Sequence, residues 1–230
     1  MKVFAHRGFS ALYPENTLLA FQKALEAGAD GIETDLRLTR DGHIVLFHDD
    51  DLLYLAGIKG KVESFTLERL QELKIGEGES IPTLESLLSL VHGDAILILE
   101  IKYVPETYKK VCESVAQMIA DKLDWVEVSC FEDNVLEYIH RLNPSVRLHK
   151  IIDTSSVLAT MSENSHNDYL YYLDINMALR EEALKRGLLD KYEVILWTVA
   201  KEDLTKEIEA GLYGVMMDDM REAYRYRGPL

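Results

Sequence analysis

Apolar and β-branched residues recur in short runs along this chain of 230 residues, with longer amphipathic stretches between them. This alternation is typical of parallel strands joined by helical crossovers, the α/β class. Eight strands are expected, at residues 2–6, 31–37, 95–101, 125–130, 146–151, 169–175, 193–199 and 213–218. Eight strands in 230 residues leave about 29 residues per unit, close to the ~30 of a βαβ repeat. The pattern therefore predicts a closed TIM (β/α)8 barrel.

The stretches between these strands carry the periodicity and the end signals of helices. We expect helices at 17–27, 84–91, 105–121, 132–141, 178–187 and 202–209. Pro82-Thr83 is a typical opening of the helix that follows it. Gly28, Gly187 and Gly211 stand where glycines commonly end a helix.

The span 41–80 departs from the regular repeat and predicts a small insertion after the second strand. Residues 42–47 indicate an extra strand, and the rest is loop-rich around one short helix near 66–73. Barrels of this length commonly form one domain, so we expect a single domain over residues 1–230. Its last residues, 219–230, predict a terminal helix outside the barrel.

The charge balance narrows the partners of the protein. Lys and Arg number 25 against 40 Asp and Glu, a formal net charge of −15. Such a chain is a poor nonspecific binder of nucleic acid or of anionic membrane surfaces. A small anionic substrate would therefore need a local cluster of positive charge.

The cysteines and the apolar runs bear on location. Only Cys112 and Cys130 are present, and without a CxxC pair they suggest neither a disulfide scaffold nor a zinc site. No apolar run approaches transmembrane length, and the start of the chain leaves no room for a signal peptide before the first strand. We expect a cytoplasmic protein without stable membrane association, although a chain cut from a precursor would look the same. The oligomeric state is left open.

Carboxylates at two strand ends predict a cation site. Side chains alternate across a strand, so Glu33 and Asp35 point the same way, and Glu100 and Lys102 repeat this spacing on the next barrel strand. Isolated pairs of this kind are usually surface features of edge strands, but apolar flanks and neighbouring histidines favour a site here. Ligation by Glu33, Asp35 and Glu100 suits one hard divalent cation, Mg²⁺ or Ca²⁺, better than zinc. The sequence does not choose between the two ions.

Two histidines are expected at the same end of the barrel. His6 ends the first strand and His48 follows the extra strand, and an imidazole that titrates near neutrality suits general acid or base chemistry. Arg7 and Lys102 supply positive charge that could grip phosphate oxygens or could pair with Glu33 or Asp35. The remaining histidines are expected to be structural or surface residues: His43, His92, His140, His149 and His166.

Further residues have weaker claims. Asn16 is expected as a helix N-cap, within the helix entry Glu15-Asn16-Thr17 that follows Pro14. Asp49 could orient His48, help to hold the cation, or begin an acidic loop. Trp197 could belong to the barrel core. Packing within a strand is expected for Tyr169, Tyr171 and Tyr172, and the barrel mouth is a possible place for Lys150 and Met216.

A long series of spaced motifs carries a family resemblance. It runs through His6-Arg7-Gly8, Pro14-Glu15-Asn16-Thr17, Gly28-Ala29-Asp30-Gly31-Ile32-Glu33-Thr34-Asp35, Thr39-Arg40-Asp41-Gly42 and His48-Asp49, and more sparsely through Ile81-Pro82-Thr83-Leu84-Glu85, Glu100-Ile101-Lys102, Ser129-Cys130-Phe131, Trp197-Thr198-Val199 and Gly211-Leu212-Tyr213-Gly214-Val215. In this series the chain closely resembles the glycerophosphodiester phosphodiesterase family.

The resemblance implies a metal-dependent hydrolysis of glycerophosphodiesters to sn-glycerol 3-phosphate and an alcohol. It implies catalytic roles for His6 and His48, without deciding which is acid and which is base, or whether water or the 2-hydroxyl of the substrate attacks first. It implies substrate binding by Arg7 and Lys102 and a pocket wall at Trp197, and it places Glu15 and its neighbours at the edge of the site.

Several positions depart from the family pattern. Leu53-Tyr54 stands where an arginine-threonine pair is usual, Ala200 replaces an asparagine, and Met217-Asp218-Asp219-Met220 replaces an acidic-proline ending. These changes concern the rim, so the reaction class is better supported than the substrate. The alternatives are a lysophospholipase D-type hydrolase on the same fold and a non-catalytic barrel that binds phosphoryl ligands. A zinc or binuclear hydrolase is disfavoured because the first strand lacks a His-x-His pair.

Overall fold

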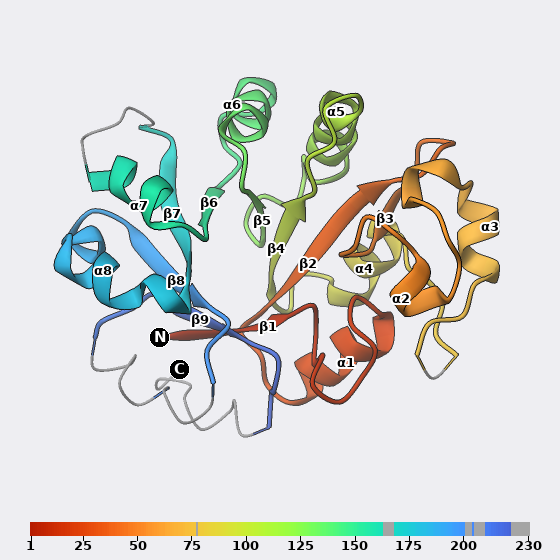
Figure 1. The fold of residues 1–230 in the computed structure, drawn as a ribbon, viewed down its shortest axis with the longest axis horizontal. Coiled ribbons are helices and arrows are strands. Elements are labelled where there is room, and N and C mark those ends of the chain that lie inside the picture. Colours follow the sequence, from red (N-terminus) through yellow and green to blue (C-terminus); the bar gives the residue numbers. More distant parts are fainter. Residues whose placement is uncertain (77, 163–167, 201–203, 205–209, 222–230) are drawn as a thin grey trace.

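The predicted strands form one closed barrel in the computed structural model, which describes every residue except 77, 163–167, 201–203, 205–209 and 222–230 (Figure 1). Within the described residues eight parallel strands pair around the ring, and β1 closes it by pairing with both β2 and β9. The TIM-barrel prediction is confirmed. The barrel strands are β1 (Lys2–His6), β2 (Gly31–Leu38), β4 (Ile96–Ile101), β5 (Val126–Cys130), β6 (Leu148–Ile152), β7 (Leu170–Asn176), β8 (Glu193–Trp197) and β9 (Gly214–Met217).

Helices surround the strands on the outside of the barrel (Figure 1). Five of the predicted helices are present: α1 (Leu18–Glu26), α4 (Leu84–Val91), α5 (Tyr108–Met118), α6 (Asp133–Leu142) and α8 (Arg180–Lys185), the last between the 3-10 turns η2 (Met177–Leu179) and η3 (Leu188–Asp190). α4 has the predicted bounds, α6 is shifted by one residue, and the other three are shorter than predicted. Except for Leu204, the helix predicted at 202–209 lies outside the described residues, as does His166. The tail helix predicted at 219–230 is described only at 219–221, which are not helical. The described helices show no segment with the length and apolarity needed to cross a membrane.

Two helix details differ from expectation. α7 (Ser155–Ser162) was not predicted, because serine and threonine break up its apolar residues. The N-cap of α1 is Thr17, whose side chain accepts a hydrogen bond from the amide of Ala20. The N-cap prediction for Asn16 is therefore wrong, and this residue has another role in the site. The predicted opening of α4 is confirmed, with Thr83 as its cap.

The span after β2 folds as a separate layer beside the barrel. β3 (Ile44–Leu46) pairs antiparallel with β2, and α2 (Leu53–Ala56), η1 (Val62–Ser64) and α3 (Leu67–Glu72) follow it. This layer encloses a small apolar core of its own: Val45, Phe47, Leu52, Val62, Leu70, Leu73, Ile75 and Ile81. The pairing of β3 with β2 brings His48, two residues past β3, beside the end of β2.

The barrel interior is apolar on one side and ionic on the other. Phe4, Ile98, Ile195 and Met216 pack together inside the ring. Across from them His149 is fully buried on β6, with Nε2 2.9 Å from Glu127 Oε2 and Nδ1 3.0 Å from Asp174 Oδ1. The prediction that His149 is structural agrees with this placement. Both sets of side chains fill the barrel below its carboxyl-terminal end.

Candidate active site

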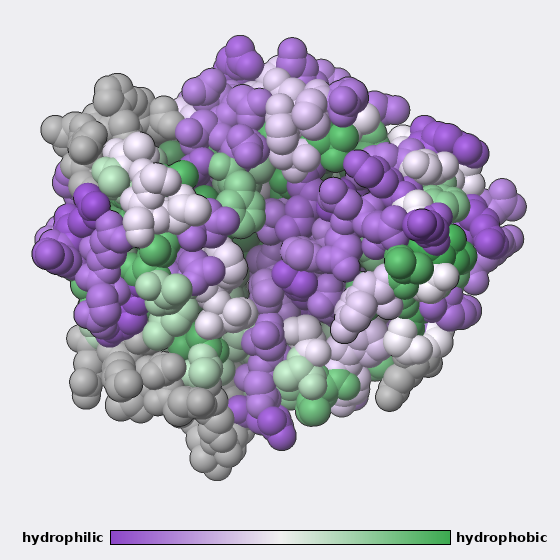
Figure 2. All heavy atoms as spheres, in the orientation of Figure 1, coloured by the Kyte–Doolittle hydropathy of each residue, from purple (hydrophilic) through white to green (hydrophobic). Residues whose placement is uncertain are grey.

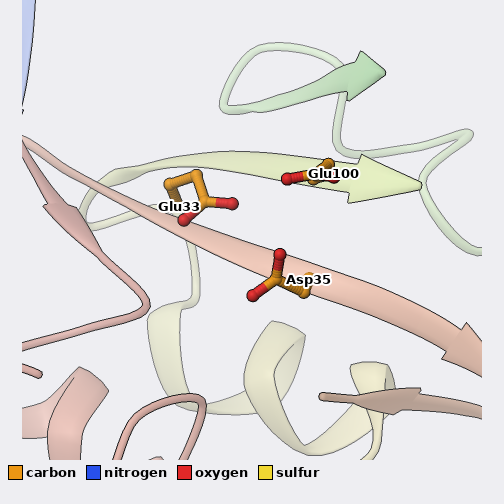
Figure 3. Close-up of side chains that lie close together, drawn as sticks. All are labelled: Glu33, Asp35 and Glu100. Carbon is orange, nitrogen blue, oxygen red and sulfur yellow. The ribbon is translucent and has the colours of Figure 1, made fainter. Parts of the chain in front are cut away.

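Three carboxylates meet at the carboxyl ends of two neighbouring strands. Glu33 and Asp35 lie on β2, and Glu100 lies on β4, where it pairs in register with Asp35. Figure 3 shows the three side chains pointing toward one another, and one oxygen from each lies within 4.8 Å of the others. All three residues are buried. The alternation along β2 and the pairing of β2 with β4 together produce the cluster that the sequence predicts.

Asp35 accepts a hydrogen bond from an asparagine that lies just before α1. Asn16 Nδ2 donates to Asp35 Oδ2 at 2.7 Å, and Asn16 Oδ1 accepts from Thr34 Oγ1 at 2.7 Å. Asn16 has a φ of +56°, a left-handed conformation that asparagine tolerates better than most residues. Its role is therefore to position a carboxylate of the site.

Two cationic side chains neutralise part of the cluster. Lys102 Nζ lies 2.7 Å from Asp35 Oδ1 and 2.6 Å from Glu100 Oε1. Arg7 Nε lies 3.4 Å from Asp35 Oδ2, and Arg7 Nη1 donates to Glu15 Oε1 at 3.1 Å. Both therefore pair with Asp35, one of the two partners considered from the sequence.

The backbone of Arg7 is also shaped for the site. Its φ is +56°, and its amide donates to Glu33 Oε2 at 3.2 Å. A bulky residue rarely adopts this conformation, and the cases that occur are concentrated at ligand sites. The turn after β1 thus presents both an N–H group and a guanidinium to the cluster.

The two carboxylates of β2 differ in their affinity for protons. Burial acts to raise the pKa of Asp35, but Lys102 and Arg7 outweigh it and hold the pKa well below its usual range. Burial raises the pKa of Glu33 well above its usual range, and the neighbouring Asp35 and Glu100 carboxylates raise it further. Burial, with Asp35 opposite, also raises the pKa of Glu100 to about 7, against the effect of Lys102. Fully ionised, the three carboxylates would carry one charge more than Arg7 and Lys102 balance, and the raised pKa values of Glu33 and Glu100 reflect that cost.

These residues fit a hard divalent cation. Three convergent carboxylate oxygens are the donor type that Mg²⁺ and Ca²⁺ take in proteins. The raised pKa of buried Glu33 shows that its charge lacks a sufficient partner within the protein. A bound cation would supply that partner.

Each predicted histidine has a carboxylate partner on one ring nitrogen. His6 Nδ1 lies 2.7 Å from Asp218 Oδ1, and His48 Nδ1 lies 2.8 Å from Asp49 Oδ1. A carboxylate only accepts, so the proton of each neutral ring sits on Nδ1 and Nε2 is left free to act. The hydrogen bond from His6 lowers the pKa of Asp218. Burial lowers the pKa of His48, although Asp35 opposes this effect.

Both histidines, both cations and two of the three carboxylates border one open pocket, whose volume with its mouth is about 420 Å³; Asp35 lies behind Lys102 and does not line it. The charged side of its wall contains His6, Arg7, Glu33, His48, Glu100 and Lys102, and the opposite side contains Ser129, Phe131, Ile151, Asp174, Trp197 and Met216. Figure 2 shows hydrophilic side chains over the middle of this face, around β2 and β4. The pocket thus joins an ionic wall to a mostly apolar one.

The weaker sequence candidates divide between the pocket and other places. Trp197 and Met216 line the pocket. Lys150 does not: its Nζ lies 2.8 Å from Asp133 Oδ1 at the start of α6, so its placement at the mouth is wrong. Tyr172 packs inside the barrel against His149, whereas Tyr171 is 66% exposed, which contradicts its expected packing.

Sequence reasoning missed three polar residues of the pocket region. Asp218 was noted only as a departure from a family motif, although the pairing of β9 with β1 brings it to His6. Ser129 and Asp174 were not chosen, although each points inward by the same alternation that selects Glu33. The alternation that points Ser129 and Asp174 inward is visible in the sequence, but it identifies them as pocket residues only when the strand register is known.

Comparison with sequence families and known proteins points in one direction. A sequence model described as the glycerophosphoryl diester phosphodiesterase family matches residues 6–222. A protein of Caldanaerobacter subterraneus subsp. tengcongensis named glycerophosphodiester phosphodiesterase is 34% identical, over 94% of this chain and 93% of that protein. A protein of Bacillus subtilis named putative glycerophosphodiester phosphodiesterase YhdW is 31% identical, over 95% of this chain and 94% of its own length.

Solved structures resemble the fold over nearly its whole length. The crystal structure of glycerophosphodiester phosphodiesterase from Thermotoga maritima has a TM-score of 0.83 and 28% identity, covering 99% of this chain and 98% of that one. A phosphodiesterase from Oleispira antarctica, solved in complex with the product sn-glycerol-3-phosphate, has a TM-score of 0.86 and 24% identity, covering 98% of this chain and 96% of that one. At 24% identity, the similarity to the Oleispira antarctica structure supports the fold alone.

Proposed function

Because the chain belongs to the glycerophosphoryl diester phosphodiesterase family and is a phosphoric diester hydrolase, we propose that its pocket hydrolyses glycerophosphodiesters with one divalent cation and two histidines. The products are sn-glycerol 3-phosphate and an alcohol. The observation that carries the proposal is the convergence of three carboxylates, two cations and two oriented imidazoles on one pocket.

The histidines do the proton transfers in this proposal. The free Nε2 of one ring takes the proton of the attacking hydroxyl, which is water or the 2-hydroxyl of the substrate. The other ring acts in its doubly protonated form and gives its Nε2 proton to the oxygen of the leaving alcohol, as the P–O bond breaks. If the 2-hydroxyl attacks first, water then opens the cyclic phosphate that results. Asp218 and Asp49 hold the two rings in the required tautomer and orientation.

The charged wall binds the phosphate. Arg7 and Lys102 border the pocket and stabilise the negative charge that develops on the phosphoryl oxygens. Glu33, Asp35 and Glu100 hold the cation. When bound, the cation, Mg²⁺ or Ca²⁺, supplies charge neutralisation and orientation of the substrate oxygens. Trp197 forms the wall beside the organic part of the substrate.

We extend the proposal to the whole chain. Residues 1–230 act as one domain, with the insertion at about 41–80 supplying His48 to a site that otherwise belongs to the barrel. A cytoplasmic enzyme with a small-molecule phosphodiester substrate, and without nucleic acid or a membrane as partner, agrees with the acidic composition.

The test is release of sn-glycerol 3-phosphate from sn-glycero-3-phosphocholine and sn-glycero-3-phosphoethanolamine. EDTA should abolish release, and Mg²⁺ or Ca²⁺ added in excess should restore it. His6→Ala and His48→Ala should each lower turnover by about 10² to 10⁴, the usual contribution of a general acid or base. His43→Ala is the matched control, because His43 is exposed and lies outside the pocket.

Two results would contradict the proposal. A fully active His48→Ala protein would remove that residue from the mechanism. A folded wild-type protein that releases no glycerol 3-phosphate with either cation, but cleaves micellar lysophosphatidylcholine, would move the function to a lysophospholipase D-type reaction.

A further inference from the structure

Two buried oxygen atoms of the pocket have no hydrogen-bond partner in the described part of the chain and no role in the chemistry above. Asp174 on β7 and Ser129 on β5 are each 1% exposed, and both line the pocket. Asp174 Oδ2 and Ser129 Oγ are buried and have no hydrogen-bond partner among the described residues. A buried polar atom without a partner is destabilising, so such an atom usually binds a ligand or a water molecule.

Asp174 is fixed from below by the ionic side of the barrel. Its Oδ1 lies 3.0 Å from His149 Nδ1, and His149 Nε2 lies 2.9 Å from Glu127 Oε2. Arg147 Nε lies 3.0 Å from Glu127 Oε1 and continues the network toward the other end of the barrel. Trp197 Nε1 donates to the backbone carbonyl of Asp174 at 3.0 Å. The carboxylate therefore cannot turn freely, and its second oxygen is the one left unpaired.

The barrel arrangement places this oxygen opposite the cation cluster. Glu33, Ser129, Asp174 and Met216 come from β2, β5, β7 and β9, which alternate around the ring as the members of one layer do. β2 and β7 stand on opposite sides of the eight strands, so Glu33 and Asp174 face each other across the pocket. Ser129 pairs in register with Glu100 and lies between the two sides.

We propose that Asp174 and Ser129 bind the terminal hydroxyl of the substrate's glycerol, the C1 hydroxyl of an sn-glycero-3-phosphodiester. Asp174 Oδ2 accepts its proton in a hydrogen bond, and Ser129 Oγ–H donates to its oxygen. This inference rests on the proposed function, because it takes the phosphate to lie against Arg7 and Lys102.

The glycerol, not the leaving alcohol, suits this position. The alcohol differs between substrates and must depart, whereas glycerol is common to all of them and ends in a hydroxyl. The subsite lies inside the barrel, beneath Phe131 and Trp197, whose rings meet edge to face at 6.3 Å. A hydroxyl that donates to a buried carboxylate satisfies an oxygen that the protein alone leaves unpaired.

The subsite also predicts which lipids are rejected. In a lysophospholipid with its acyl chain at C1, this hydroxyl is an ester and has no proton to donate. Asp174 Oδ2 would then remain unpaired, and the acyl chain would have to fit inside the barrel beside this carboxylate. The structure thus favours deacylated glycerophosphodiesters over lysophospholipids.

The test compares sn-glycero-3-phosphocholine with its 1-deoxy analogue, in which hydrogen replaces the C1 hydroxyl. Wild-type kcat/KM should be about tenfold to a hundredfold higher for the hydroxylated substrate, the range expected for one hydrogen bond to a charged group. In Ser129→Ala and in Asp174→Asn this preference should shrink at least fivefold. Asn keeps an oxygen for His149 and nearly the same volume, and thermal unfolding checks that each variant folds.

Two results with the wild-type protein and its variants would overturn the subsite. Equal kcat/KM for the two compounds in the wild-type protein would overturn the proposal and leave the two atoms to a water molecule. A preference that persists undiminished in both variants would also overturn it, because another group would then read the hydroxyl. If neither compound is hydrolysed, the proposed function fails. Calorimetric binding of sn-glycerol 3-phosphate and of its 1-deoxy analogue then decides the subsite alone: tighter binding of the first supports it, and equal binding overturns it.

Discussion

Two carboxylates on the same face of one strand show how strongly single residues depend on their neighbours. Asp35 has Lys102, Arg7 and the amide of Asn16 around its oxygens. Among the described residues, Glu33 accepts a hydrogen bond only from the backbone amide of Arg7, at 3.2 Å, and has His6 Nε2 4.0 Å away. Ionised Asp35 is therefore stabilised within the protein, whereas ionised Glu33 is the costly member of the cluster without a cation.

Glu33→Gln should make the cation-free protein more stable. The folded-state pKa of Glu33 lies above its unfolded value, so near pH 7 ionisation of this side chain opposes folding, and the amide removes that charge. We expect the unfolding temperature in EDTA to rise by about 2–4 °C or more, the shift that 1 kcal/mol produces in a chain of this size. Mg²⁺ or Ca²⁺ should stabilise the wild-type protein and have little effect on the variant.

Glu137→Gln is the matched control for this experiment. It removes the same charge as Glu33→Gln, but from an exposed position on α6. It should leave both the unfolding temperature in EDTA and the response to cation as in the wild type. A Glu33→Gln protein that is less stable in EDTA yet still gains stability from the cation would contradict the assignment of Glu33 to the cation site.

Among single residues, the sequence predicts those site residues that the alternation of side chains along a strand is enough to identify. Glu33, Asp35 and Glu100 follow from the two-residue period of a strand and an apolar flank. Asn16 was misassigned because an asparagine after proline at a helix start is equally suited to capping, and only its left-handed backbone turns it toward Asp35. Asp218 was missed because its partner His6 lies 212 residues away, a separation that no local pattern bridges.

The junction between β1 and α1 depends on a glycine that packs without a side chain. Gly8 has a φ of +82°, and a Cβ atom there would lie 2.8 Å from the backbone carbon of Ala20 and 2.8 Å from its Cβ. Gly57 has a similar φ of +68° but meets nothing within 4 Å. The pair therefore separates the cost of backbone conformation from the cost of a clash with a helix.

Gly57→Ala should destabilise the protein by about 1 kcal/mol, because alanine must adopt a left-handed conformation. Gly8→Ala should cost about 3 kcal/mol or more, since it adds a clash that moves α1 or the turn. Denaturant unfolding measures both. Gly8→Ala should also lower activity, because Arg7 is its neighbour, whereas Gly57→Ala should not. Equal costs for the two variants would show that α1 yields to the added methyl group.

Three neighbouring strands share a buried ionic contact that should make stability depend on pH. Burial acts to lower the pKa of His149 on β6, but Asp174 on β7 and Glu127 on β5 outweigh it and raise the pKa to about 9. The folded value exceeds the unfolded value of about 6.5, so the stabilisation is complete below that pH and is lost as the pH rises through about 9.

We therefore expect the free energy of unfolding to fall by about 3 kcal/mol between pH 6.5 and pH 10, as His149 loses its proton. Denaturant unfolding over this range measures the fall. His149→Gln keeps hydrogen-bonding groups but does not titrate, so its stability should change much less. A wild-type curve parallel to that of the variant would refute the ionic contact.

At the scale of elements, the sequence predicts strands better than the connections between them. All eight barrel strands were predicted because apolar and β-branched residues recur in each short run, although β2 and β6 also carry charged side chains. α7 was not predicted, since serine and threonine interrupt its pattern. In the insertion the predicted extra strand and short helix are present as β3 and α3, whereas α2 and η1 were not predicted. The position of His48 at the site was nevertheless predicted correctly, because the short turn after β2 leads to the antiparallel pairing of β3 with β2.

The whole molecule carries a formal charge of −15, and its substrate contains a phosphodiester anion. Arg7 and Lys102 are already paired with carboxylates, so the site offers little free positive charge to act over distance. The long-range field should therefore repel substrates with a net negative charge and act weakly on zwitterions.

Salt should reveal this repulsion. sn-Glycero-3-phosphoglycerol carries one net negative charge, whereas sn-glycero-3-phosphocholine is neutral overall. Raising the salt concentration from about 10 to about 300 mM shortens the screening length from about 30 Å to less than 10 Å. With the cation saturating, we expect the ratio of kcat/KM for the anionic substrate to that for the zwitterion to rise about two- to fivefold. The zwitterion corrects for effects of salt on the protein. A ratio that falls with salt would mean that the cations of the pocket attract the substrate more strongly than the acidic surface repels it.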